Sequence, residues 1–283
     1  MNTPIASHIL ACYITLLLAS VITVIFYRQG FFNNASDRLS NSSPTTSSLF
    51  SLFMIFISAG AIGVPIVSVL FFYFTRMAVP ERTPQFIGWL NFMALSTSSF
   101  AVIIYSALQP LNEKKATWGR GSIKDFAIGF SAWLMSFAWV LLIGQIMKFI
   151  AFELGEEHQV EQKAVQYLKG VLNMPLLLIL NVIAVVVIVP IAEEILFRGY
   201  LQRWMVSKIG RSMGIVLTAA IFSLFHFSAS QGWNNIEISL SLFVLALFLG
   251  LLYELRGTLW APIGLHMAFN LVSVCIIIFR VVA

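Results

Sequence analysis

Six polar side chains interrupt long apolar stretches in the C-terminal half of the chain. They are Glu193, Glu194, Arg198, His226, His266 and Asn270. Such groups are expensive inside a membrane, and by default they mark a functional site. A carboxylate beside an imidazole can activate a water molecule as a general base, while a second imidazole and an amide can stabilise an oxyanion. The residue types therefore indicate a candidate hydrolytic centre.

The same residues allow a second chemistry. Glu193, His226 and His266 could bind zinc and leave one coordination position open for water. The chain contains no HExxH motif, so it is not expected to be a zincin. Serines flank His226, but none lies in a GxSxG elbow, which argues against a serine nucleophile.

Helical spacing distinguishes the roles of these residues. Glu194 and Arg198 are four residues apart, so on a helix they share a face, can pair, and neutralise each other. Glu193 points about 100° away from Glu194 and lacks that partner, which makes it the better candidate for chemistry. His266 and Asn270 are also four apart and present two polar groups on one face.

These residues must be positioned by membrane helices. Hydrophobic residues make up 59% of the chain and charged residues only 10%, against about 25% charged in a soluble domain. Since about 20 apolar residues can cross a bilayer, we predict an all-α, polytopic transmembrane bundle with roughly eight spans. The predicted limits are 7–27, 49–75, 85–108, 126–150, 172–206, 212–229, 236–254 and 259–280. Pro190 interrupts the fifth span and predicts a kink or break there.

The depths of the polar groups agree across three of these spans. Glu194 and His226 lie equally far from a turn near Gly210, at about 24 Å along their helices. His266 lies about 14 Å beyond a second turn near Gly257. Two spans separate the turns, so both lie on one side of the membrane. Three helices are therefore expected to bring their polar groups to a common region.

The net charge of +5 comes mainly from Lys and Arg in short loops. There they act as topology determinants, and no basic stripe with interleaved aromatic residues suggests nucleic-acid binding. The positive-inside rule favours a multi-pass protein with both termini outside, in the plasma membrane if the source is bacterial or archaeal. We divide the chain into a four-span region (1–152), an interfacial amphipathic connector (153–171) and a four-span catalytic core (172–283).

The polar residues also carry a resemblance to a known family. EEILFRGY at 193–200 resembles the EExxxR motif of the CPBP family, the intramembrane proteases related to the type II CAAX prenyl endopeptidase and to the bacteriocin-processing or immunity (Abi) proteins. FSLFH at 222–226 is similar to its FxxxH motif and HMAFN at 266–270 to its HxxxN motif. The ordered set of three motifs is far more specific than any one of them, and the resemblance spans roughly 170–280.

The resemblance implies roles for these residues. Glu193 and His226 would activate water, and His266 with Asn270 would form the oxyanion site, or His266 would help to hold a metal such as zinc. Glu194 and Arg198 would be supporting residues, and Phe222, four residues before His226, is expected to pack beside it. The implied partners are membrane lipid and a membrane-associated or lipidated peptide or protein, prenylated or bacteriocin-like. Both a metallopeptidase and a metal-free glutamate mechanism stay open.

Two further functional classes are open on the sequence. A non-catalytic immunity or adaptor protein of the same fold would not need a water-activating carboxylate. A proton-coupled transporter would use buried Glu and His as a relay, but here the polar groups gather at one depth instead of tracing a path across the bilayer. Histidine and asparagine in membrane helices also serve simply to join helices by hydrogen bonds.

Overall fold

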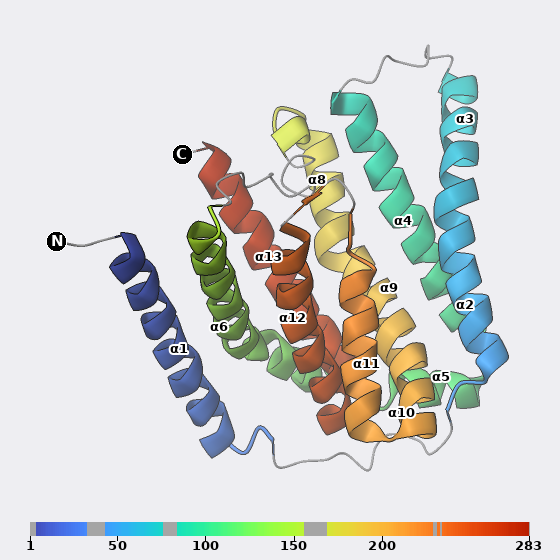
Figure 1. Cartoon of the computed structure of the whole chain (residues 1–283). Helices are drawn as coiled ribbons and strands as arrows, with labels where there is room; N and C mark the ends of the chain where they lie inside the picture. Colours follow the sequence, from blue (N-terminus) through green and yellow to red (C-terminus); the bar gives the residue numbers. More distant parts are fainter. Residues whose placement is uncertain are drawn as a thin grey trace.

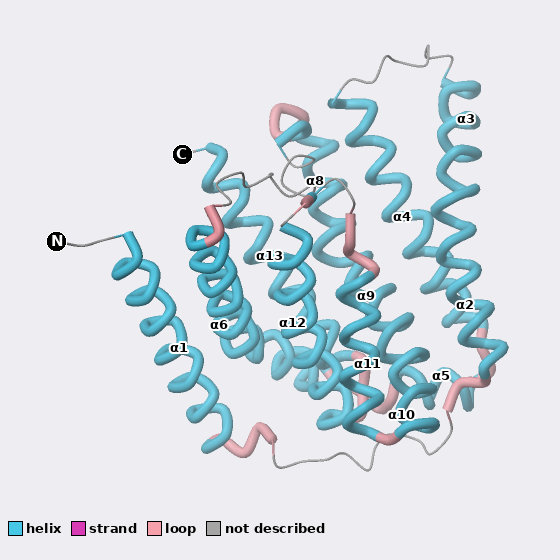
Figure 2. Tube along the Cα trace, viewed as in Figure 1, coloured by secondary structure: helices cyan, strands magenta, loops and turns pink. Residues whose placement is uncertain are grey.

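The computed structural model describes residues 4–32, 43–75, 84–155, 169–228, 231–232 and 234–282. These residues form a bundle of helices, and no strand occurs among them (Figures 1 and 2). Within these described ranges, seven helical stretches are long and apolar enough to cross a membrane. The predicted all-α class is confirmed, and the chain is an integral, multi-pass membrane protein.

The first half of the bundle comprises α1 (Pro4–Arg28), α2 (Thr46–Ser58), the π-helical turn η1 (Ala59–Gly63), α3 (Val64–Thr75), α4 (Pro84–Leu108), α5 (Leu111–Trp118) and α6 (Ile123–Glu153). The second half comprises α8 (Pro175–Ile183), η2 (Ala184–Ile188), α9 (Val189–Glu194), η3 (Ile195–Gln202), α10 (Arg203–Ile209), α11 (Arg211–Leu224), α12 (Asn234–Arg256) and α13 (Trp260–Val282). The start of α1 and the end of α13 lie at one end of the bundle, opposite the turn between α10 and α11 (Figure 1). Which membrane side this end faces stays a prediction.

Two sequence predictions differ from the structure. The sixth predicted span, 212–229, is wrong in length, because α11 has only 14 residues and ends at Leu224. The short helix α5 lies between the third and fourth predicted spans, in an interval for which no helix was predicted. Most of the predicted connector, residues 156–168, lies outside the described part of the chain.

Pro190 does not break the fifth span, which runs as one helical stretch from α8 to α10. A π-helical turn accommodates the proline: the N–H of Val189 donates to the carbonyl of Ala184, five residues back. In that register the carbonyl of Val185 would pair with the N–H of Pro190, which proline lacks. The amide Nδ2 of Asn270 on α13 donates to this carbonyl instead, at 2.9 Å.

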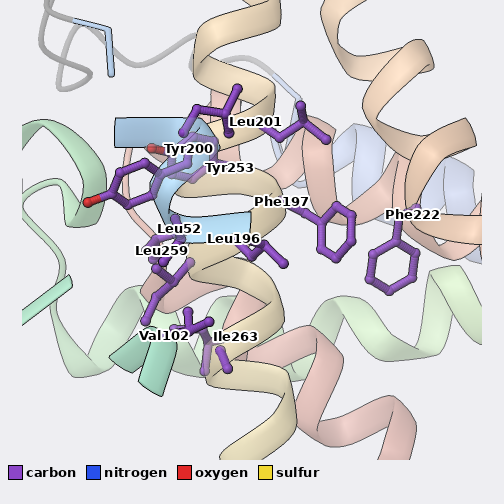
Figure 3. Close-up of a cluster of buried hydrophobic side chains, with 14 of the residues drawn as sticks. Leu52, Val102, Leu196, Phe197, Tyr200, Leu201, Phe222, Tyr253, Leu259 and Ile263 are labelled. Carbon is purple, nitrogen blue, oxygen red and sulfur yellow. The ribbon is translucent and has the colours of Figure 1, made fainter. Parts of the chain in front are cut away.

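The main hydrophobic core surrounds η3 and combines both halves of the chain (Figure 3). Leu52 and Val102 come from α2 and α4, and they are fully buried with Phe197 and Phe222 close by in the same cluster. The rings of Phe197 and Phe222 meet edge to face with their centroids 5.0 Å apart. This packing joins the helix that carries Glu193 to the helix that precedes His226.

Helix α13 is held at a fixed depth by the turn that precedes it. The carbonyl of Trp118 accepts hydrogen bonds from the N–H of Leu259 and from Oγ1 of Thr258, both at 3.0 Å. Gly119 and Gly257 let the two turns approach, because each has a positive φ, +66° and +64°. The depth of His266 in the membrane therefore depends on contacts at the C-terminal end of α5.

Helices α6 and α13 cross backbone to backbone at two glycines. A Cβ atom on Gly129 would overlap the carbonyl oxygen of Ala261, and one on Gly264 would overlap the carbonyl oxygen of Phe126. Both neighbours are backbone atoms of helices, so neither can move without shifting a helix. The small residues therefore set the distance between α6 and the helix that carries His266.

We expect Gly129→Ala to lower the free energy of unfolding by about 2–3 kcal/mol, as overpacking does in a closely packed core. Gly144→Ala on the same helix is the matched control. Its Cβ would lie 3.6 Å from the Glu237 carboxylate, an ordinary contact distance. Thermal unfolding of both variants in detergent measures the difference. Equal unfolding midpoints for the two variants would contradict the close crossing.

Candidate active site

Three elements bring the candidate catalytic side chains together. Glu193 lies near the end of α9, His226 follows α11, and His266 lies on α13. Glu193 Oε1 is 3.9 Å from Nε2 of His226, and its Oε2 is 3.6 Å from Nε2 of His266. These distances exceed those of direct hydrogen bonds, as is common for catalytic groups before substrate binds. The one carboxylate therefore faces two imidazoles.

The other ring nitrogen of each histidine is engaged. His226 Nδ1 lies 2.9 Å from the carbonyl oxygen of Phe222, and a carbonyl only accepts, so Nδ1 carries the proton. His266 Nδ1 lies 2.7 Å from Oε1 of Glu194 and donates to that carboxylate. In a neutral ring of either residue the lone pair is therefore on Nε2, which faces Glu193.

This arrangement makes two roles of His266 mutually exclusive. With Nδ1–H donated to Glu194, Nε2 can bind a metal only when the ring is neutral. Nε2 can donate to an oxyanion only when the ring is an imidazolium. A neutral and a cationic His266 therefore correspond to the two mechanisms that the sequence left open.

Glu194 and Arg198 form the pair that helical spacing predicted. Arg198 Nη1 is 2.9 Å from Glu194 Oε1, and both side chains have 0% exposure. The guanidinium also donates to the carbonyl of Ala246 on α12 at 3.3 Å and lies over the Phe222 ring, 4.7 Å from its centroid. Glu194 Oε1 thus accepts from both Arg198 and His266, which ties the orientation of one imidazole to a buried ion pair.

Phe222 lies against both imidazoles. Its ring centroid is 4.9 Å from that of His226 and 6.0 Å from that of His266, and the side chain is fully buried. The aromatic ring supplies an apolar wall on one side of the site. Glu193 and His226 keep exposed fractions of 16% and 34%, so the opposite side of the site is accessible.

Asn270 is placed differently from the other predicted residues. One hydrogen of its amide is used by the carbonyl of Val185, the group that Pro190 leaves without a helical donor. This bond joins α13 to the π-helical turn before Glu193. A role of Asn270 in catalysis would use the second N–H of its amide as the hydrogen-bond donor.

Gln202 is a buried polar residue that the sequence interpretation did not single out. Its Nε2 lies 3.0 Å from both the carbonyl of Gly250 and Oε1 of Glu254 on α12. Arg198 and Gln202, four residues apart, both donate to backbone carbonyls of α12, those of Ala246 and Gly250, whereas Glu194, four residues before Arg198, bonds to His266 on α13. The four-residue spacing from Arg198 was the signal by which the sequence could have singled out Gln202.

The donor types of Glu193, His226 and His266 suit zinc, since two neutral imidazoles would offer Nε2 and their Nδ1 atoms are held by a carbonyl and a carboxylate. Across the described ranges, no group of three or more His, Cys, Asp or Glu side chains is already arranged to hold a metal ion. Coordination by all three would therefore require side-chain movement.

Comparison with known proteins supports the resemblance for the C-terminal part of the chain. Residues 175–272 match the family described as type II CAAX prenyl endopeptidase Rce1-like. The uncharacterized protein YpbD of Bacillus subtilis (strain 168) is 30% identical over 100 residues, which cover 35% of this chain and 47% of that protein. The chain thus spans about half the length of the curated relative it matches. No solved structure matches. The segment from α8 to α13 is therefore similar to the family whose motifs it carries.

Proposed function

We propose, from the similarity of residues 175–272 to the type II CAAX prenyl endopeptidases, that the chain is an intramembrane endopeptidase. One observation supports this most strongly: the Glu193 carboxylate faces Nε2 of two histidines, and both rings are oriented by bonds at Nδ1. An adaptor protein has no need to orient two imidazoles on one carboxylate.

In the proposed reaction, Glu193 and His226 bind the attacking water. Glu193 accepts a proton from it while the water oxygen bonds to the carbonyl carbon of the scissile peptide. The carbonyl oxygen becomes an oxyanion, which imidazolium His266 and the second N–H of Asn270 stabilise. The intermediate collapses as the carbon–nitrogen bond breaks, and Glu193 returns the proton to the leaving amine.

A zinc-dependent form of the reaction would use the same residues. Glu193, His226 and neutral His266 would hold the ion, which would supply Lewis acidity and lower the pKa of bound water. In both forms Glu194 and Arg198 keep the His266 ring in place. The two forms differ in the protonation of His266.

We propose a substrate that is itself bound to the membrane. The site lies among membrane-spanning helices, and the exposed residues beside His226 are large and apolar: Leu224, Phe225 and Phe227. A lipidated peptide, of prenylated CAAX or bacteriocin-like type, would place its peptide bond near this surface. An apolar anchor raises the local concentration of such a substrate at the membrane.

The proposal is tested with purified protein and a panel of lipidated peptides, with and without a chelator, together with a measurement of bound zinc. Cleavage that a chelator stops and zinc restores establishes the zinc form. Cleavage indifferent to chelator, with no stoichiometric metal, establishes the glutamate form. A wild-type protein that cleaves neither prenylated nor unprenylated lipopeptides argues for the adaptor function.

A further inference from the structure

His226 is not held by a helix of its own. α11 ends at Leu224, and the residues that follow are fixed by turn hydrogen bonds. The N–H of His226 donates to the carbonyl of Ser223, and the N–H of Phe227 donates to that of Leu224, both at 3.1 Å. These bonds fix the start of the segment 225–228 on α11, and its far end requires a separate attachment.

Asn235, in the first turn of α12, provides that attachment. Its Oδ1 accepts from the N–H of Ser228 at 3.0 Å, and its Nδ2 donates to the carbonyl of the same residue at 2.7 Å. Asn235 is only 5% exposed. Two bonds from one planar amide to one residue fix both the distance and the rotation of Ser228 relative to α12.

The location of this segment explains why it needs such a partner. α11 stops short of the upper ends of α8 and α13 (Figure 1), so the chain leaves helical structure inside the height of the bundle. Non-helical backbone at membrane depth is tolerated only where protein or a water-filled cavity satisfies its polar groups. The amide of Asn235 satisfies both backbone groups of Ser228, and the N–H of Gln231 adds a second bond to the Ser228 carbonyl at 2.9 Å.

We infer that Asn235 is a positioning residue for His226. It holds the segment 225–228 against α12, so that Nε2 of His226 stays opposite Glu193. This inference rests on the proposed function for its catalytic consequence. The attachment itself is a property of the fold and can be measured without a substrate.

The test compares Asn235→Leu with Asn181→Leu, a control that removes an amide bonded within its own helix, to the carbonyl of Leu177. For Asn235→Leu we expect kcat to fall by about 10–100-fold with KM within about twofold, because a misplacement of about 1 Å costs that much. The control is expected to keep wild-type kinetics. If the leucine variant does not fold, Asn235→Asp replaces it in the test. Aspartate keeps the size of the side chain and the oxygen that accepts from Ser228, and we expect a smaller loss of activity.

A double-mutant cycle distinguishes the positioning of His226 from a merely structural role of Asn235. In a His226→Ala background, Asn235→Leu is expected to change the residual kcat by less than about twofold, since residues that act as a unit are not additive. A full additional loss in that background would overturn the inference.

Hydrogen exchange supplies the readout that does not depend on activity. Amides of the segment 225–228 are expected to exchange faster in Asn235→Leu than in wild type, with α12 and α13 unchanged. Unchanged protection of the segment overturns the inference whatever the kinetics. A wild-type protein without peptidase activity rejects the proposed function, and exchange then decides on its own whether Asn235 holds the segment.

Discussion

Glu193→Gln is expected to reduce peptide cleavage by at least about 10³-fold, the upper part of the range for loss of a general base. Glutamine keeps the size of the side chain but cannot accept the proton from water, and it is a poor ligand for zinc. The thermal unfolding midpoint should stay near that of wild type, because the carboxylate is partly exposed and lies beyond hydrogen-bond distance of both histidines. Initial cleavage rates and unfolding curves in the same detergent measure the two quantities.

Glu237→Gln is the matched control for this result. Glu237 is another carboxylate within a membrane-spanning helix, and its Oε1 lies against Gly144 of α6. Its neutralisation is expected to leave cleavage at the wild-type rate. Wild-type cleavage by Glu193→Gln would reject Glu193 both as the base of the metal-free form and as a zinc ligand of the zinc form. Loss of cleavage in both variants would indicate a general sensitivity to lost charge.

The sequence predicted the helices and the meeting of the polar residues for a physical reason. Hydrocarbon allows few polar side chains, so the apolar runs are unambiguous and the exceptions stand out. Equal distances from the Gly210 turn placed Glu194 and His226 at one depth, and the structure has Glu193, next to Glu194, facing His226. Spacing of four residues likewise gave the contact between Glu194 and Arg198.

The remaining features depend on contacts between distant segments, which hydropathy does not record. The end of α11 at Leu224 is one example, because Phe225 and Phe227 extend the apolar run past the last helical residue. The amide of Asn235, seven residues beyond Ser228, satisfies both backbone groups of Ser228 where the chain has left the helix.

Pro190 is a second example. Its missing N–H predicted a kink or a break, and the structure has no break. The helix continues because a side chain on α13, Asn270, supplies a donor to Val185. The sequence singled out Asn270 but not its pairing with Val185, because the bond joins residues 85 positions apart.

Arg198→Met is expected to destabilise the fold by about 3–5 kcal/mol, the cost of leaving one member of a buried ion pair without its partner. Glu194 would keep a charge at 0% exposure with only the imidazole of His266 beside it. The guanidinium contacts with the Ala246 carbonyl and the Phe222 ring would also be lost. Unfolding of the purified protein, followed by circular dichroism against temperature or denaturant, measures the change.

Two further variants test whether the loss of stability comes from the buried charge that is left without its partner. Arg211→Met removes an arginine with 42% exposure that lies 3.6 Å from Glu254, and it is expected to cost less than about 1 kcal/mol, as exposed pairs do. The double variant Glu194→Gln with Arg198→Met removes both charges and should recover a large part of the lost stability. It should still cleave slowly, because His266 would lose the carboxylate that orients its ring. If Arg198→Met unfolds like wild type, the pair does not stabilise the fold, and its role is confined to holding His266 opposite Glu193.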